Sequence, residues 1–170
     1  LEFSDDSIVI NSFSKYYSMT GWRVGWMVVP ENLVRNIECL TQNLYISAPT
    51  LSQYGALAAF DCKKELNANV ERYKENRTIL LSGLHEAGFT KIAPADGAFY
   101  IYSDVSDLTN DSEHFCHKIL EDTGVAITPG IDFDQGRGNA FVRLSFSGST
   151  QIIREASDRL KDWMSKQGKR

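Results

Sequence analysis

The sequence predicts a mixed fold, α/β in its first part and α+β in its second. Three patterns lead to this prediction. Two short apolar runs near the start are followed by apolar residues at helical spacing. One long helical pattern then occupies the middle of the chain. After it, short apolar runs are interspersed with two further helical patterns, which is typical of an α+β arrangement.

The first part is expected to contain two strands and two helices. One strand is residues 7–13, whose continuous apolar centre indicates burial, and the other is residues 22–29, which a proline ends. Serine, tyrosine, threonine and glycine dominate the connection between them. Apolar residues at three- and four-residue spacing predict a helix over 31–44. A second helix is predicted over 50–60.

The longest helical pattern covers residues 66–87 and ends before Gly88, which stands where a C-terminal cap glycine is expected. Its apolar stripe is interrupted at Arg77. A helix with such an interruption can change its packing partner along its length. We therefore expect a domain boundary near residue 75, with residues 1–75 in a first domain and 76–170 in a second.

Short strands and two helices are expected in the second part. The strands are residues 98–102, 125–128 and 141–146. A helix over 110–122 has Asn110 as a candidate N-cap, with Glu113 three residues later. A last helix follows Ser149, its candidate N-cap. Its expected apolar face is formed by Ile152, Ile153, Ala156, Leu160 and Trp163.

Composition and charge exclude several classes of function. Hydrophobic residues make up 42% and charged residues 24% of the 170-residue chain, as in a globular protein. The net charge of -4 argues against general nucleic-acid binding. No run approaches the ~20 apolar residues of a membrane span, and no signal peptide opens the chain. The three cysteines are far apart, which favours a reducing, cytoplasmic setting.

Residues 11–26, NSFSKYYSMTGWRVGW, hold a lysine and an arginine among hydroxyl and aromatic residues. An amine at the end of a buried strand and near a second cation is favoured in its neutral form, which can attack a carbonyl and form a Schiff base. The hydroxyls of Ser12 and Ser14 with the guanidinium of Arg23 would suit a phosphate dianion. The alternatives are a solvated Lys15, serines that simply occupy turns, and a structural ion pair of Arg23.

Two other groups of residues give weaker signals. His114 and His117 are three residues apart on an expected helix, but a third ligand is missing, so no metal site is predicted. Arg137 lies between two glycines and is interpreted as part of a turn rather than of a phosphate loop. No glycine-rich nucleotide loop is found in the chain.

The run SFSK at 12–15, followed by GWRVGW at 21–26, closely resembles the cofactor-lysine signature of class I pyridoxal-phosphate aminotransferases. These are fold-type-I enzymes related to aspartate aminotransferase. The resemblance continues in the family's order through DGAFY at 96–100, ITPG at 127–130 and FVRLSF at 141–146. It implies the C-terminal part of this fold, namely the end of the large α/β domain plus the α+β small domain.

The resemblance also implies a role for each site residue. Lys15 would form the Schiff base with pyridoxal 5'-phosphate and move the proton between the substrate and the cofactor. Ser12 and Arg23 would bind the cofactor phosphate, with Ser14 as a weaker candidate. Arg143 would bind the substrate α-carboxylate, for which a planar guanidinium gives a bidentate grip. The alternative for Arg143 is an exposed residue of a half-buried strand.

The implied reaction moves an amino group from an amino acid to a 2-oxo acid, in a cytoplasmic homodimer. A lyase or synthase of the same fold and a non-catalytic dimerisation or effector module are the alternatives. The chain starts at Leu1 and lacks the family's phosphate loop, asparagine, aspartate and tyrosine, which precede the lysine. We therefore expect a fragment that is inactive, or nearly so, by itself.

Overall fold

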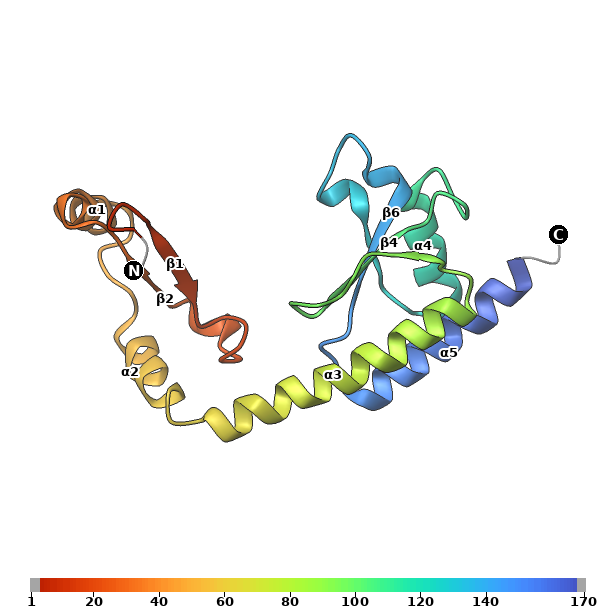
Figure 1. The fold of residues 1–170 in the computed structure, drawn as a ribbon, viewed down its shortest axis with the longest axis horizontal. Coiled ribbons are helices and arrows are strands. Elements are labelled where there is room, and N and C mark those ends of the chain that lie inside the picture. Colours follow the sequence, from red (N-terminus) through yellow and green to blue (C-terminus); the bar gives the residue numbers. More distant parts are fainter. Residues whose placement is uncertain (1–3, 168–170) are drawn as a thin grey trace. The chain divides into compact units, whose positions relative to one another are not determined.

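The computed structural model describes residues 4–167 (Figure 1). The chain divides into two compact units between Ala68 and Asn69. This division falls inside the long helix α3 (Lys63–Glu86), the helix in which the sequence analysis expects a domain boundary near residue 75. The boundary between 1–75 and 76–170 stays a prediction.

The first unit begins with two antiparallel strands, β1 (Val9–Ser12) and β2 (Gly25–Val28). Val9 lies opposite Val28, and Ser12 lies opposite Gly25. Glycine is required at position 25, because a Cβ there would lie 2.6 Å from the carbonyl oxygen of Asn11.

Strand β2 is shorter than the range 22–29 that the sequence analysis predicts. Residues Thr20–Trp22 form a 3-10 turn, η1, and Arg23 has a left-handed backbone with φ of 51°. A strand requires extended backbone, so pairing starts only at Gly25.

Two helices complete this unit, α1 (Glu31–Leu44) and α2 (Thr50–Ala59), both close to their expected ranges. A small core joins α2 to the connection between the strands. Its buried members are Phe13, Met19, Ala56 and Ala59.

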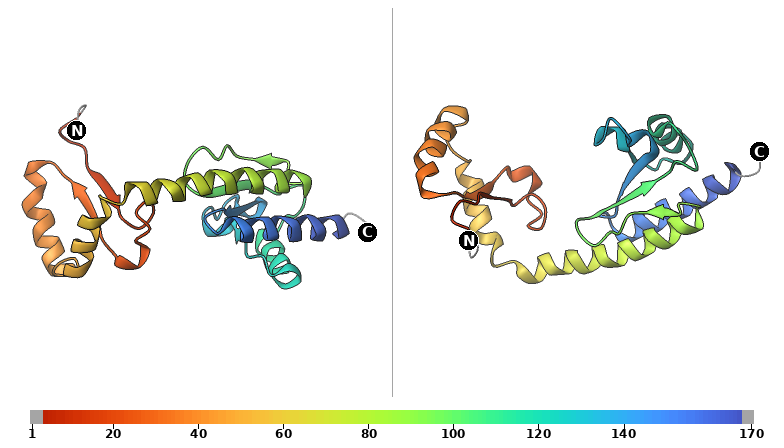
Figure 2. Two further views of the ribbon diagram at one scale, coloured as in Figure 1. Left: turned by 90° about the horizontal axis from the view of Figure 1, so that it is seen from below. Right: turned by 45° about the horizontal axis from the view of Figure 1, so that its top comes forward.

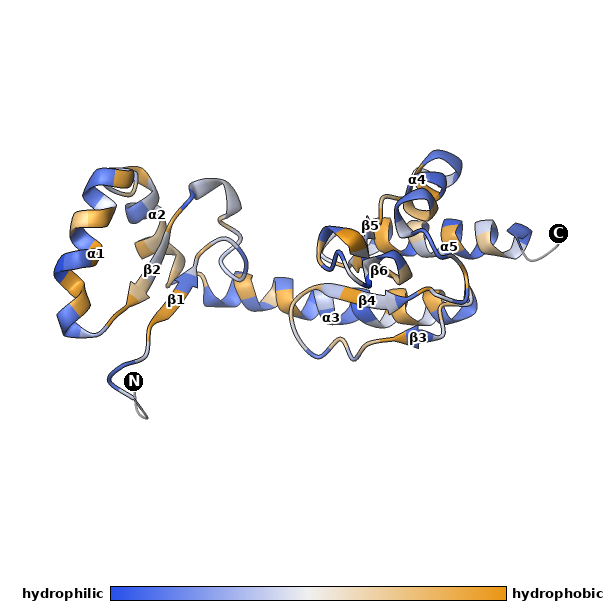
Figure 3. Cartoon of the chain, turned by 90° about the horizontal axis from the view of Figure 1, so that it is seen from above, coloured by the Kyte–Doolittle hydropathy of each residue, from blue (hydrophilic) through white to orange (hydrophobic). Residues whose placement is uncertain are grey.

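The expected burial of the strand over 7–13 is wrong for the described residues. The side chain of Ile10 is 74% exposed, and all four residues of β2 are exposed as well. Hydrophobic positions occur along both strands and both helices of this unit (Figure 3), and many of their side chains are exposed. The most exposed of them are Ile10, Leu44, Ile46, Leu51 and Tyr54. Exposed apolar area of this extent is typical of a surface that another part of a protein covers.

The second unit contains a four-stranded antiparallel sheet in the order β3-β4-β6-β5. Its strands are β3 (Lys91–Ile92), β4 (Tyr100–Asp104), β6 (Phe141–Ser145) and β5 (Thr128–Pro129). The expected strand over 98–102 starts two positions late, because Ala98 has a left-handed backbone with φ of 56°. The strand expected over 125–128 pairs with the sheet only at its end, from Thr128.

Alternation along the strands gives this sheet a buried face and a half-buried face. Ile101, Val142 and Leu144 are buried on one face. Tyr100 and Arg143, on the other face, are half-buried. The first face thus builds the core, while the second keeps part of its side chains exposed.

Three helices share the core with the buried face, namely α3, α4 (Ser112–Thr123) and α5 (Thr150–Gln167). The second half of α3 and α5 run side by side (Figure 2). Each helix contributes fully buried side chains, such as Leu84, Ile119 and Leu160. No helix within residues 4–167 has the length and apolar character needed to cross a membrane.

The polar interruption in α3 has a local cause within the second unit. Asn76 is buried and donates hydrogen bonds of 2.9 Å to the carbonyl oxygens of both Phe146 and Gly148. The Arg77 guanidinium donates to the carbonyl oxygen of Ala95 at 2.8 Å. These side chains tie the helix to the loop before β4 and to the segment after β6.

The C-terminal end of α3 and the N-terminal end of α5 agree with the sequence analysis, whereas α3 begins at Lys63, three residues before its expected start. Gly88 has φ of 91° and donates to the His85 carbonyl oxygen, while Phe89 N–H donates to that of Leu84, which is the Schellman pattern. The Ser149 hydroxyl accepts from the N–H of Ile152 as the N-cap of α5.

Two details of α4 and α5 differ from expectation. The N-cap of α4 is Asp111, whose carboxylate accepts from the N–H of His114 at 3.0 Å, and not Asn110. Both residue types cap helices well, so the sequence alone did not separate them. Ile152 lies on the exposed side of the first turn of α5, outside the apolar face that Ile153 and Leu160 form.

Helix α3 approaches α5 at Gly83, where an added Cβ would overlap the hydroxyl of Ser157. Helix propensity alone would make Gly83→Ala stabilising by about 1 kcal/mol. We expect the opposite sign, a loss of about 1–3 kcal/mol, because the buried Ser157 hydroxyl must leave its place and the Ser157 Cβ, 3.0 Å from the added Cβ, must shift as well. Urea unfolding measures the change, and Ser82→Ala on the exposed side of the same turn is the control. A Gly83→Ala chain as stable as the original would contradict this packing.

Burial raises the pKa of the Cys116 thiol to about 12, and the nearby Asp132 carboxylate adds to the shift. The thiolate is the reactive form, so Cys116 is expected to resist alkylation at pH 8. Iodoacetamide should label the exposed Cys62 first and Cys116 only after unfolding, as peptide mapping by mass spectrometry would report. Equal labelling rates in native buffer would show that the core around Cys116 is open.

Candidate functional site

The loop between β1 and β2 carries Lys15 and is held to the first unit by two buried side chains. Phe13 is 4% exposed and Met19 is 6% exposed. The Phe13 ring contacts those of Tyr17 and Phe60, with centroids at 4.6 and 5.5 Å. A backbone hydrogen bond also links the two ends of this segment, since the N–H of Met19 donates to the carbonyl oxygen of Phe13. The loop is therefore an ordered part of the unit rather than a loose connection.

Lys15 itself is exposed, next to the buried Phe13. Its carbonyl oxygen accepts from the N–H of Ser18, which has a left-handed backbone with φ of 56°. The turn thus fixes the backbone of Lys15, while its side chain stays at the surface of the described unit. The sequence analysis expected an amine at the end of a buried strand, and the strand is instead exposed.

Arg23 returns to this turn from the far end of the loop. Its Nη1 donates to the carbonyl oxygen of Thr20 at 2.9 Å and lies 3.5 Å from Ser14 Oγ. Ser14 N–H in turn donates to Ser12 Oγ at 3.1 Å. The structure therefore brings Ser12, Ser14 and Arg23 together around the turn of Lys15.

Ser12 and Ser14 do not lie in one strand, because β1 ends at Ser12 and residues 13–15 form a bend. The two serines are linked instead through a backbone N–H, as in other turns stabilised by a serine hydroxyl. The guanidinium contacts Ser14 and not Ser12, although the resemblance makes Ser14 the weaker candidate. Both serines stay candidate phosphate ligands.

The chemistry of this loop fits a phosphate group. A guanidinium and two hydroxyls are donors of the kind that bind phosphate oxygens. Within residues 4–167, no carboxylate pairs with Arg23, so its charge is not neutralised by the unit that carries it. An exposed cation beside hydroxyls is what a dianionic ligand requires.

Arg143 lies in the second unit, on the half-buried face of β6. Its register partners are Tyr102 on β4 and Thr128 on β5. The guanidinium carbon lies 4.2 Å from the ring centroid of Tyr100 and 4.2 Å from that of Phe133. The sequence analysis gave neither ring a role, because Tyr100 appeared only as the last residue of DGAFY and Phe133 lies just outside the motifs, in a loop that gives no periodic signal.

The loop that carries Phe133 begins with η2 (Gly130–Asp132) and ends with η3 (Gly138–Ala140). Gly130 and Gly138 cross so closely that a Cβ on either would overlap backbone atoms of the other segment. Asp134 accepts from Arg137 Nε at 3.0 Å and from two backbone N–H groups. Arg137 is therefore part of a turn, as expected.

Metal ligands are not gathered in the described residues. No group of three or more His, Cys, Asp or Glu side chains in residues 4–167 could hold a metal ion. His117 Nδ1 lies 3.5 Å from the Glu121 carboxylate, one helical turn away. The pair of histidines on α4 thus remains without a third ligand in this part of the chain.

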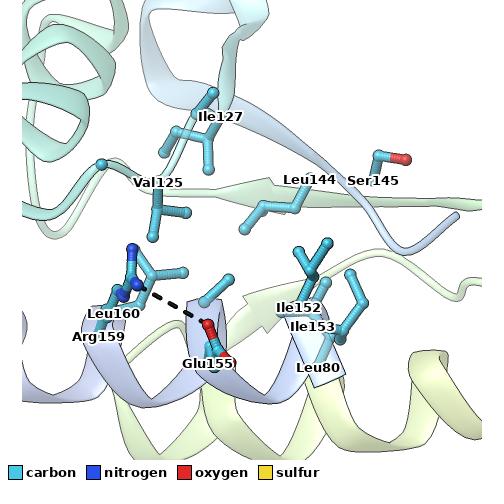
Figure 4. Close-up of a pocket in the computed structure, with 13 residues that line it drawn as sticks. Leu80, Val125, Ile127, Leu144, Ser145, Ile152, Ile153, Glu155, Arg159 and Leu160 are labelled. Atoms are coloured by element: carbon cyan, nitrogen blue, oxygen red, sulfur yellow. Dashed lines mark ion pairs between the residues drawn. The ribbon is translucent and has the colours of Figure 1, made fainter. Parts of the chain in front are cut away.

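The second unit also contains a pocket of about 220 Å³ between α5 and the strand region (Figure 4). Apolar side chains line most of it, including Leu80, Val125 and Ile153. Glu155 and Arg159 form an ion pair of 3.8 Å at its edge. None of the five candidate site residues lines this pocket, so its chemistry is separate from theirs.

Known proteins resemble this chain along nearly its whole length. Residues 1–160 match the family described as Aminotransferase class I and II. A valine–pyruvate aminotransferase of Mycobacterium tuberculosis is 52% identical over 166 residues, which are 96% of this chain and 43% of that protein. An aspartate aminotransferase of Sulfurisphaera tokodaii is 32% identical over 96% of this chain and 42% of its own length.

Solved structures agree with these sequence matches. The crystal structure of an aminotransferase from Mycobacterium tuberculosis superimposes with a TM-score of 0.94 at 51% identity, covering 97% of this chain and 43% of that one. A Thermus thermophilus aspartate aminotransferase gives a TM-score of 0.81 at 29% identity, over 91% of this chain and 42% of that one. The chain thus spans less than half the length of these relatives, and it belongs to the class I and II aminotransferase family.

Proposed function

We propose that the protein to which this chain belongs transfers an amino group from an amino acid to a 2-oxo acid with pyridoxal 5'-phosphate as cofactor. The observation that carries the proposal is the ordered loop that presents Lys15 beside Ser14 and Arg23. The names of the relatives, which include valine–pyruvate and aspartate aminotransferases, support the same reaction.

The residues of the loop share two tasks in this proposal. The amine of Lys15 would hold the cofactor through its aldehyde carbon, and Ser12, Ser14 and Arg23 would hold its phosphate. The bound cofactor supplies an electron sink for the substrate α-carbon. Lys15 would take the proton from that carbon and deliver it to the cofactor carbon that had carried the aldehyde, so that the amino group stays with the cofactor.

Arg143 would bind the substrate carboxylate that both the amino acid and the 2-oxo acid carry. Its guanidinium is half-buried, and no carboxylate within residues 4–167 forms an ion pair with it. One cation at this position can therefore serve both half-reactions, because the two substrates differ at the α-carbon and share the carboxylate.

The exposed apolar side chains of the first unit support the view that this chain is part of a larger assembly. Ile10, Leu44 and Leu51 are examples of side chains that a folded partner would cover. We propose that the upstream part of the longer protein and a second copy in a homodimer cover them. The 170-residue chain alone is then inactive or nearly so. A cytoplasmic location is supported by three unpaired cysteines.

Lys15→Ala in the full-length protein is expected to abolish cofactor attachment, because no other amine lies in this turn. Borohydride reduction with pyridoxal 5'-phosphate followed by peptide mapping should find the adduct on Lys15 in the wild type only. Lys166→Ala, in the last turn of α5, is the control. Amino-acid turnover should fall by about 10³-fold or more, the scale of losing a general base.

The same assay separates the alternatives. Conversion of the bound cofactor to its amine form identifies a transaminase, whereas release of ammonia or pyruvate identifies a lyase. Turnover by the isolated 170-residue chain at the full-length rate would disprove the proposal that it is an inactive part.

Arg23→Lys in the full-length protein is expected to weaken cofactor binding, because lysine lacks the planar donor set that spans two phosphate oxygens. The dissociation constant should rise by about tenfold or more, in line with losing one strong charged hydrogen bond. Equilibrium dialysis measures it. Arg35→Lys is the matched control, since Arg35 pairs only with the exposed Glu38 at 3.2 Å. Equal affinity of both variants would remove Arg23 from the phosphate site.

A further inference from the structure

We propose that Tyr100 and Phe133 are positioning residues for Arg143. In this proposal the two aromatic rings fix the orientation of the guanidinium and leave its N–H groups available to a carboxylate. The proposal rests on the proposed function above, because it assigns the rings a task in binding the substrate carboxylate. It adds residues from two other elements of the second unit to that task.

The distances support direct contact. Both ring centroids lie 4.2 Å from the guanidinium carbon of Arg143, well within the ~6 Å range of an attraction between a cation and an aromatic ring. A guanidinium that stacks on a ring is restrained in rotation, while the hydrogen-bond donors at its edge stay unused. The contacts thus fix the group without occupying its donors.

The alternative way of orienting an arginine is an ion pair, and this unit does not use it. Among residues 4–167, no carboxylate forms an ion pair with Arg143. An acidic neighbour would fix the guanidinium equally well, but it would also compete with a substrate carboxylate for the same N–H groups. Aromatic rings avoid this competition, and they also exclude water from the faces of the cation, which strengthens its interaction with an anion.

Both rings are themselves held in place by the fold. Tyr100 lies on β4 opposite Ser145 of β6, on the same half-buried face as Arg143. Phe133 follows η2, and its N–H donates to the carbonyl oxygen of Gly130 at 2.9 Å.

The loop of Phe133 is also tied to α4. The buried hydroxyl of Ser112 donates to the Gly138 carbonyl oxygen at 3.0 Å, at the point where the loop closes. The ring therefore approaches Arg143 from a closed loop, although it is 51% exposed. Because it is not part of the core, its replacement should change binding more than stability.

The test uses the full-length protein with its cofactor and three variants. Phe133→Leu and Tyr100→Leu remove a ring each, and Phe133→Trp keeps an aromatic face. Phe141→Leu is the matched control, since the Phe141 ring stacks on Tyr102, with centroids at 5.1 Å, rather than on Arg143.

The ring-removing variants should raise KM by about tenfold for the amino acid and for the 2-oxo acid alike, with a smaller change in kcat. The equal effect is expected because the two substrates share the carboxylate. Phe133→Trp should restore the original KM, and Phe141→Leu should leave it unchanged. An unchanged KM in Phe133→Leu and Tyr100→Leu, or the same rise in Phe141→Leu, would overturn the proposal.

A second measurement does not depend on turnover. Phenylglyoxal modifies guanidinium groups, and 4-methylpentanoate is a carboxylate that carries no amino or oxo group. In the wild type, 4-methylpentanoate should protect Arg143 from modification, as peptide mapping reports. In Phe133→Leu this protection should require about tenfold more of the carboxylate.

The two measurements distinguish the two proposals. If the wild type transfers no amino group but the protection still depends on Phe133, the proposed reaction fails and the positioning role stands. If transfer occurs and protection is the same in Phe133→Leu as in Phe141→Leu, the positioning role fails and the reaction stands.

Discussion

The burial of Phe13 is the interaction on which the arrangement of the candidate cofactor loop depends. Phe13 lies between Ser12 and Ser14 and directly precedes the turn of Lys15. Its ring packs in the small core with Met19 and α2, and removing a ring from such a position costs about 3–5 kcal/mol. Ser12 is exposed and Ser14 is half-buried on the two sides of this buried ring. The buried Phe13 thus fixes the backbone between the two serines, while their hydroxyls stay near the surface.

In the second unit, buried apolar neighbours likewise determine where a polar side chain lies, here on strand β6. Val142 and Leu144 are buried, so the residue between them must project from the other face of the sheet. Arg143 is thereby kept out of the core, where an unpaired cation would be very unfavourable. The rigid strand also limits the positions that the guanidinium can reach. Tertiary contacts with Tyr100 and Phe133 restrict it further.

Sequence patterns predicted the regular parts of the fold well. The apolar stripe over 31–44 predicted the range of α1. Gly88 predicted the end of α3 and Ser149 the start of α5, because the left-handed backbone of a cap glycine and the hydrogen bond of a cap serine depend on neighbouring residues only. Burial of the first strand was predicted wrongly, because an apolar run does not show whether other parts of the chain pack against it. The described residues do not supply the atoms that would cover Ile10.

The sequence predicted the candidate site residues that lie close together in the chain, but not the contacts between segments that only the fold brings together. The motif at 12–15 and 21–26 indicated four of the site residues, and the left-handed backbone of Arg23 explains how the second segment returns to the first. Phe133 reaches Arg143 from a loop whose two ends meet at Gly130 and Gly138, where the chain folds back toward the sheet. No periodic pattern encodes such a contact, so only the folded structure reveals it.

The crossing of Gly130 and Gly138 separates the loop over residues 131–137 from the sheet at a single point. The two ends of the loop are held together by backbone atoms and by Ser112, whatever side chains lie between them. The strands that carry Arg143 and its register partners thus lie outside this loop. Variation confined to this short segment would alter the covering of Arg143 while the position of its backbone is preserved. The side chains that surround Arg143 from this loop can thus differ while the strand that carries Arg143 stays the same.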